Sequence, residues 1–131
     1  MINMTKKKTL EILDVINMLM VPNDENFSIL LSYFFVWFKP VWLKTSIKNH
    51  TNPRIVLEKY TNGMYYTLTK NILTLWWDTY LNDFLSDANK VYEYLSRDPE
   101  LKKILDTEEG RKYLNYAVSE IYNWAYDIVS A

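Results

Sequence analysis

Apolar side chains recur at helical spacing along most of this chain, and one stretch departs from that pattern. Residues 27–38 read Phe-Ser-Ile-Leu-Leu-Ser-Tyr-Phe-Phe-Val-Trp-Phe, and ten of these twelve side chains are apolar or aromatic. The run is long for a strand, and Ser28 and Ser32 lie four residues apart, which places them on one face of a helix. We therefore predict a helix here.

Three environments suit such a helix: a membrane, the core of a folded domain, or a surface that awaits a partner. A membrane-spanning helix needs about 20 apolar residues. Lys39 and Pro40 interrupt this run after twelve, and adding Val41 to Leu43 extends it to only 17 with a charge and a proline inside. We predict no transmembrane span, and we favour the central, enclosed helix of a bundle, either within one subunit or between two.

The segment before this run predicts an amphipathic helix that Thr5 can cap and that ends near Val21-Pro22, because proline disfavours helix in the residue before it. Asn23 to Asn26 then form a turn and the cap of the next helix. The apolar positions of the first helix are Ile12, Leu13, Ile16, Leu19 and Met20.

The middle of the chain alternates between polar connections and helix signals. Residues 44–52 are mostly polar, with a turn expected at Asn49-His50. Asn52 followed by Pro53 is a typical helix start, and Asn62-Gly63 is a typical stop. A short helix is therefore predicted over residues 54–60.

The segment from Met64 to Ser96, which follows Gly63, contains neither glycine nor proline. One helix of about 30 residues fits it, and so do two helices with a kink near Ser86-Asp87. The stripe that predicts it comprises Tyr65, Leu68, Ile72, Trp76, Tyr80 and Phe84, and it continues through Leu81, Leu85, Ala88, Val91, Tyr92 and Leu95.

Two further helices are expected near the end of the chain. Asp98-Pro99 predicts a short helix over residues 101–105, and Thr107 with the acids that follow it opens the last helix. The last helix has the most regular apolar seam, formed by Leu114, Ala117, Val118, Ile121, Ala125 and Ile128. Together these patterns predict an all-α fold: a helical bundle of four main helices with one or two short extra helices.

Composition supports this fold class. The chain has 131 residues, enough for about one domain, and only two glycines, which leaves few positions for tight hairpin turns. We predict a single domain over residues 1–131, in which residues 1–8, with three consecutive lysines, form a flexible basic arm. There is no cysteine, so neither disulfides nor thiolate chemistry is available. No signal peptide is predicted.

Charge is nearly balanced overall but unevenly distributed. The net charge is −1, while residues 1–60 carry eight Lys/Arg against five Asp/Glu and residues 61–131 carry seven against eleven. Such a dipolar subunit can stack head to tail or present a positive face to DNA. A basic strip interleaved with Trp37 and Trp42 is the candidate nucleic-acid surface, and with it the chain would be a small nucleic-acid-binding or regulatory helical protein, the alternative to a self-associating subunit. It consists of Lys39, Lys44, Lys48, Arg54 and Lys59.

Residues capable of catalysis or metal binding are few. His50 is the only histidine and lies in a polar segment, so no His-based metal motif exists. Asp83 and Asp87, four residues apart, could share a proton or bind a cation, but a solvated helix face is the commoner role. Phosphate-binding glycine loops and nucleophile motifs do not occur. The chain is therefore expected to be no enzyme and to need no cofactor.

Aromatic side chains are the most distinctive feature, with 21 of them in the chain. Five flank the apolar seam of the last helix, more aromatic surface than one small core easily buries. Tyrosine and tryptophan are enriched at protein–protein contacts. We therefore predict self-association through whatever part of residues 27–43 stays uncovered and through these side chains: Tyr113, Tyr116, Tyr122, Trp124 and Tyr126.

The whole-chain profile, from Met1-Ile-Asn-Met-Thr-Lys-Lys-Lys to Tyr126-Asp-Ile-Val-Ser-Ala131, is rich in Lys, Asn, Ile and Tyr and contains no cysteine. In length and character it resembles the coat proteins of two-tailed, spindle-shaped crenarchaeal viruses, the bicaudaviruses. The resemblance implies an α-helical bundle, a virion location, many copies per particle, contacts with other virion proteins and no catalysis. Coats that wrap DNA are typically more basic, so direct contact with viral DNA is the weaker expectation.

Overall fold

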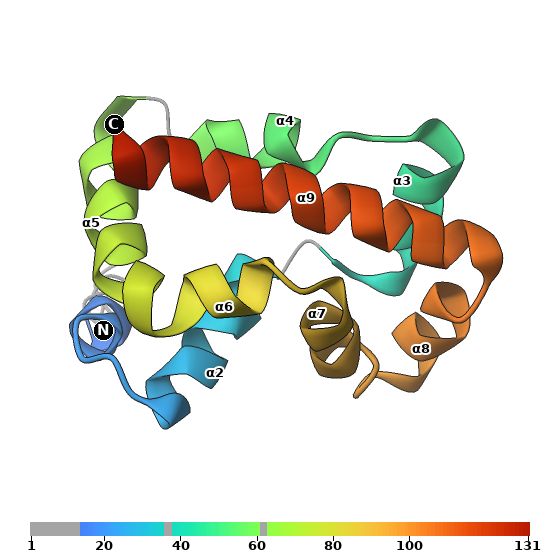
Figure 1. The fold of residues 1–131 in the computed structure, drawn as a ribbon, viewed down its shortest axis with the longest axis horizontal. Coiled ribbons are helices and arrows are strands. Elements are labelled where there is room, and N and C mark those ends of the chain that lie inside the picture. The colour runs from blue at the N-terminus through green and yellow to red at the C-terminus, as the bar shows by residue number, and fades with distance from the viewer. Residues whose placement is uncertain (1–13, 36–37, 61–62) are drawn as a thin grey trace, which may run out of the picture. The chain divides into compact units, whose positions relative to one another are not determined.

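The computed structural model describes residues 14–35, 38–60 and 63–131, and these form helices without any strand. The all-α prediction is confirmed. The prediction of four main helices is not confirmed, because eight α-helices lie wholly within the described residues: α2 (Asp24–Phe34), α3 (Pro40–Asn49), α4 (Pro53–Leu57), α5 (Tyr66–Trp76), α6 (Asn82–Leu85), α7 (Ala88–Leu95), α8 (Pro99–Leu105) and α9 (Glu108–Ser130) (Figure 1). Residues 14–19 are also helical. The predicted basic arm and the Thr5 cap lie outside the described residues.

The chain divides into two compact units, Met1–Phe35 and Val36–Ala131. The prediction of one domain stays a prediction. In the first unit, the expected turn around Asn23 is confirmed and rests on buried Asn26. Its backbone N–H donates to Asn23 Oδ1 at 2.8 Å, and its side-chain amide donates to the carbonyls of Met18 and Val21, each at 2.9 Å. The Asn26 side chain thus satisfies two carbonyls at and just after the end of the preceding helix, while the Asn23 side chain caps the start of α2.

Helix α2 is shorter than the predicted run of residues 27–38, and the reason lies at its end. It stops at Phe34, and Lys39 is extended before Pro40, the first residue of α3. Ser28 and Ser32 are exposed while Leu30 and Leu31 are buried, so α2 has one apolar face and is not enclosed on all sides. The expected break at Lys39-Pro40 is confirmed, but that proline starts a helix.

Helix α3 corrects the prediction of a polar segment over residues 44–52. Leu43 is buried and Ile47 half-buried, four residues apart on one face, while Lys44 and Thr45 between them are exposed. The expected turn at Asn49-His50 is confirmed: His50 adopts the left-handed conformation with φ 49°, and its N–H donates to the Ile47 carbonyl. Such a residue is a typical helix C-terminal cap.

Helix α9 is the centre of the second unit. It contacts α3 through α8, with α4 along one side and α6 and α7 along the other (Figure 1). Every residue of its predicted seam is buried, and so are Gly110, Tyr113 and Trp124. The predicted starts at Asn52-Pro53, Asp98-Pro99 and Thr107 are all confirmed, because each cap side chain accepts a backbone N–H of the following helix.

The region from Met64 to Ser96 follows the two-helix alternative, with one addition. A π-helical turn, Trp77–Leu81, joins α5 to α6, and the chain breaks at Ser86-Asp87 before α7. The wider π turn places the consecutive side chains Trp76 and Trp77 on the buried side together with Leu81. Asp87 is extended and accepts the N–H of Asn89, so it ends one helix and caps the next.

Candidate functional surfaces

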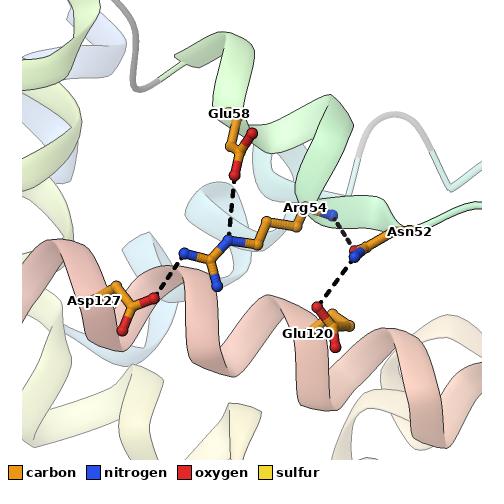
Figure 2. Close-up of polar contacts among 5 residues, drawn as sticks. All are labelled: Asn52, Arg54, Glu58, Glu120 and Asp127. Atoms are coloured by element: carbon orange, nitrogen blue, oxygen red, sulfur yellow. Dashed lines mark hydrogen bonds and ion pairs between the residues drawn. The ribbon is translucent and has the colours of Figure 1, made fainter.

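A polar cluster joins α4 to α9, and it contains Arg54 of the predicted basic strip (Figure 2). Arg54 Nη2 lies 2.6 Å from Asp127 Oδ2, and its Nε lies 3.3 Å from Glu58 Oε1. Beside it, the Asn52 side-chain amide donates to Glu120 at 3.2 Å. Two elements separated by about seventy residues in sequence are thereby held together by charge-assisted hydrogen bonds.

This cluster pairs Arg54, one of the residues predicted for the nucleic-acid surface, with two carboxylates. The Asp127 carboxylate, followed by Glu58, raises the pKa of the Arg54 guanidinium above its ordinary value. A guanidinium that already faces two carboxylates has little positive field left for a phosphate. Of the other residues in the strip, Lys44 and Lys48 lie one turn apart on α3, while Lys39 precedes that helix and Lys59 follows α4; all four lysines are exposed.

A second charged cluster lies where α7, α8 and α9 meet. Asp106 accepts hydrogen bonds from Lys102 at 2.7 Å and from the Tyr92 hydroxyl at 2.5 Å. The Arg111 guanidinium sits over the Tyr92 ring, 3.6 Å from its centroid. A cation over the face of an aromatic ring is electrostatically favourable. Four side chains, from three helices and one turn, thus hold together this corner of the fold, the junction of α7, α8 and α9.

The Asp106 carboxylate makes the stability of this corner depend on pH. The hydrogen bond from Lys102, and then that from Tyr92, lowers the pKa of Asp106 in the folded state. A lowered folded pKa contributes stability above the unfolded value of about 4, and this is lost as pH falls through the folded value. We expect urea midpoints to fall less between pH 6 and pH 3 in Asp106→Asn than in the unchanged chain. The exposed Glu93→Gln variant is the control, and equal pH dependence in all three proteins would contradict this role.

The acidic residues and the histidine considered for proton sharing or metal binding lie in helices, caps and helix ends. Asp83 lies in α6 and pairs with Lys90, and Asp87 caps α7, so the two acids do not share one continuous helix. His50 is exposed at the end of α3. Within the described ranges, no three His, Cys, Asp or Glu side chains are grouped as metal ligands would be. Among the same residues, no helix combines the length and apolar character needed to cross a membrane.

The five aromatic side chains predicted for self-association separate into two groups. Tyr113 and Trp124 are buried, and the Tyr113 hydroxyl donates to the carbonyl of Thr51 at 2.9 Å, so both belong to the interior. Tyr116 and Tyr126 are exposed, and Tyr122 is half-buried. The Tyr122 and Tyr126 rings stack with centroids 6.2 Å apart, and both contact Trp77. Only this second group can face a partner.

Further exposed apolar side chains lie on α3 and α4, and two of them fall within residues 27–43. Val41 and Trp42, in the first turn of α3, are 74% and 64% exposed, and Ile55 of α4 is 63% exposed. The sequence pattern could have indicated the exposure of Val41 and Trp42. Pro40 starts a helix whose inward positions are Leu43 and Ile47, which leaves Val41 and Trp42 on other faces.

An open groove lies between α3 and α8 and reaches the start of α9. Its volume is about 710 Å³, and a neighbouring hollow of about 480 Å³ shares Ile47, Lys48 and Glu109 with it. Pro40, Ile47 and Ile104 supply its apolar lining. The charged groups around it are Lys44, Lys48, Glu100, Lys103 and Glu109.

No protein-family model, curated protein sequence or solved structure matches this chain. The geometry of its own surfaces is therefore the basis for any functional assignment.

Proposed function

We propose that this chain is a structural subunit that self-associates into a homo-oligomer through exposed apolar side chains, and that it performs no catalysis. The observation that carries this proposal is the exposure of Val41, Trp42 and Ile55, each more than 60% accessible. Tryptophan is enriched among the residues that dominate binding energy at interfaces. Burying a large apolar side chain in a contact lowers the free energy relative to leaving it in water. Such contacts need no cofactor.

The resemblance to bicaudavirus coat proteins extends the proposal to a location. A coat protein is present in many copies, contacts itself and other virion proteins, and needs repeated modest interfaces. The all-α fold with exposed aromatic groups on α3 and α9 suits that use. The proposed localisation is therefore the virion, with a helical bundle as the building block. Purified virus particles should contain this chain in high abundance, and its absence from them would overturn the coat assignment.

Binding of viral DNA through the basic strip is the alternative function. Lys44 and Lys48, one turn apart on α3, favour it. Two features oppose it: Arg54 is paired with carboxylates, and Glu100 and Glu109 lie around the groove that these lysines line. Nucleic-acid sites gain affinity from uninterrupted positive charge. Self-association is the better supported function.

Replacing Val41 and Trp42 together by serine tests the self-association. Both side chains are mostly exposed, so the fold should remain intact while association weakens by about 30-fold in Kd, the equivalent of one interface hot spot of about 2 kcal/mol. Sedimentation velocity over a wide concentration range measures this. Asn49→Ser, an exposed polar position on the same helix, is the control. A chain that stays monomeric at millimolar concentration without any substitution would refute the proposed function.

A further inference from the structure

We propose that the groove between α3 and α8 is an interface for a second copy of this chain, in which the α3 face of each copy docks against the α8–α9 wall of the other. This inference rests on the proposed self-association and names the surface that performs it. The occupant follows from the distribution of charge and apolar surface around the groove.

The α3 side of the groove is basic and carries an apolar projection. Val41, Lys44 and Lys48 are spaced three and four residues apart, so they share one helical face. Helix α3 contains no acidic residue. Within the described part of the chain, neither lysine has a carboxylate within 4 Å, and both are exposed. This face therefore offers two unneutralised cations beside the most exposed large apolar side chain of α3.

The opposite side of the groove carries acids. Glu100 lies in the first turn of α8 and Glu109 in the first turn of α9, and both are exposed. Lys103 of α8 lies between them in sequence and offsets one of the two negative charges. Lys112 of α9 lines the neighbouring hollow but pairs with Glu108 at 3.4 Å, so this wall keeps a negative charge. The apolar lining from Ile47 and Ile104 continues between the two walls. One side of the groove is thus complementary to the other in charge.

Such a surface is complementary to itself when two copies are related by a two-fold axis. Contacts in a symmetric dimer are reciprocal, so each pairing of α3 with the α8–α9 wall occurs twice. Lys44 and Lys48 of one copy then face Glu100 and Glu109 of the other, and the exposed Val41 side chain gains an apolar lining. A polyanion such as a nucleic acid would bind the two lysines equally well, but the two glutamates would repel it. The charge pattern therefore favours a second copy over nucleic acid.

Reciprocal charge reversal tests this interface. One variant carries Lys44→Glu and Lys48→Glu, and a second carries Glu100→Lys and Glu109→Lys. In a dimer of either variant alone, like charges meet, and we expect the Kd of self-association to rise at least tenfold. In an equimolar mixture, both halves of the interface regain opposite charges, so association should return toward that of the unchanged chain. Raising NaCl to 1 M, where the Debye length is about 3 Å, should abolish the difference between single variants and mixture.

Controls and outcomes separate this inference from the proposed function. Lys59→Glu and Glu93→Lys reverse exposed charges away from the groove and should leave association unchanged. Circular dichroism checks that each variant keeps its helix content. If the unchanged chain associates and the groove variants associate equally well, the interface lies elsewhere and this inference fails while the proposed function stands. If the single variants lose association and the mixture does not recover it, the reciprocal contact is refuted. If the unchanged chain is monomeric, both proposals fail.

Discussion

Replacing Gly110 by alanine is expected to destabilise the fold by about 3 kcal/mol or more. A Cβ at this position would lie 2.0 Å from the backbone oxygen of Ile104 and 2.9 Å from its carbonyl carbon. That carbonyl cannot easily move away, because it accepts hydrogen bonds from the N–H and the hydroxyl of Thr107, at 3.3 and 2.7 Å. Alanine is otherwise preferred to glycine inside a helix by about 1 kcal/mol. Here the overlap with main-chain atoms outweighs that preference.

The only other glycine in the chain supplies the comparison. Gly63 has φ +71°, and a Cβ built there would meet no atom within 4 Å beyond its own residue and its two chain neighbours. Gly63→Ala should therefore cost only the backbone strain of a left-handed alanine, about 1–2 kcal/mol. Urea unfolding of both variants measures the difference. A Gly110→Ala protein as stable as the Gly63→Ala protein would show that the α8–α9 turn can open without loss.

Replacing Leu114 by alanine is the second change with a large expected effect, also about 3 kcal/mol. Leu114 is fully buried on α9, the helix that contacts α3 through α8. Removing a buried leucine side chain loses its transfer free energy and leaves a cavity that the surrounding helices fill only partly. Because many elements meet at α9, little rearrangement is available at this position.

The neighbouring residue is the matched control. Asn115 is exposed on the same helix, and Asn115→Ala should change the free energy of unfolding by less than about 0.5 kcal/mol. Chemical denaturation followed by circular dichroism gives both values, with equal denaturant slopes if unfolding stays two-state. A loss below about 1 kcal/mol for Leu114→Ala would contradict the central position of α9.

Helix starts could be predicted from the sequence because they depend on neighbouring residues. Asn52, Asp98 and Thr107 each cap a backbone N–H two or three positions ahead, and each start lies where the pattern placed it. The same locality explains the break at Asp87. Helix α3 was missed because its inward face contains only Leu43 and Ile47 in a mostly polar segment.

Burial of the aromatic side chains could not be predicted in the same way. A periodic seam identifies one face of a helix, but α9 is covered on more than one side, so Tyr113 and Trp124 are interior although they flank the seam. The role of Arg54 depends on Asp127, 73 residues away, and no local pattern relates the two. Its place among the lysines of the strip indicated phosphate binding, whereas its position in space pairs it with acids.

That same pairing has a consequence for the chain between the two residues. Arg54 and Asp127 close a loop of 73 residues that contains α5 through α8, and Asn52 and Glu120 close one of 68. In polymer terms, the entropy lost on closing a loop grows only with the logarithm of its length, by about 0.6 kcal/mol for each doubling. Several residues added to an exposed turn within it, such as that at Arg97, would therefore raise the closure cost by roughly a tenth of a kcal/mol. The two contacts between α4 and α9 thus fix where the ends of this segment lie, while the free energy of folding depends only weakly on how many residues the segment contains.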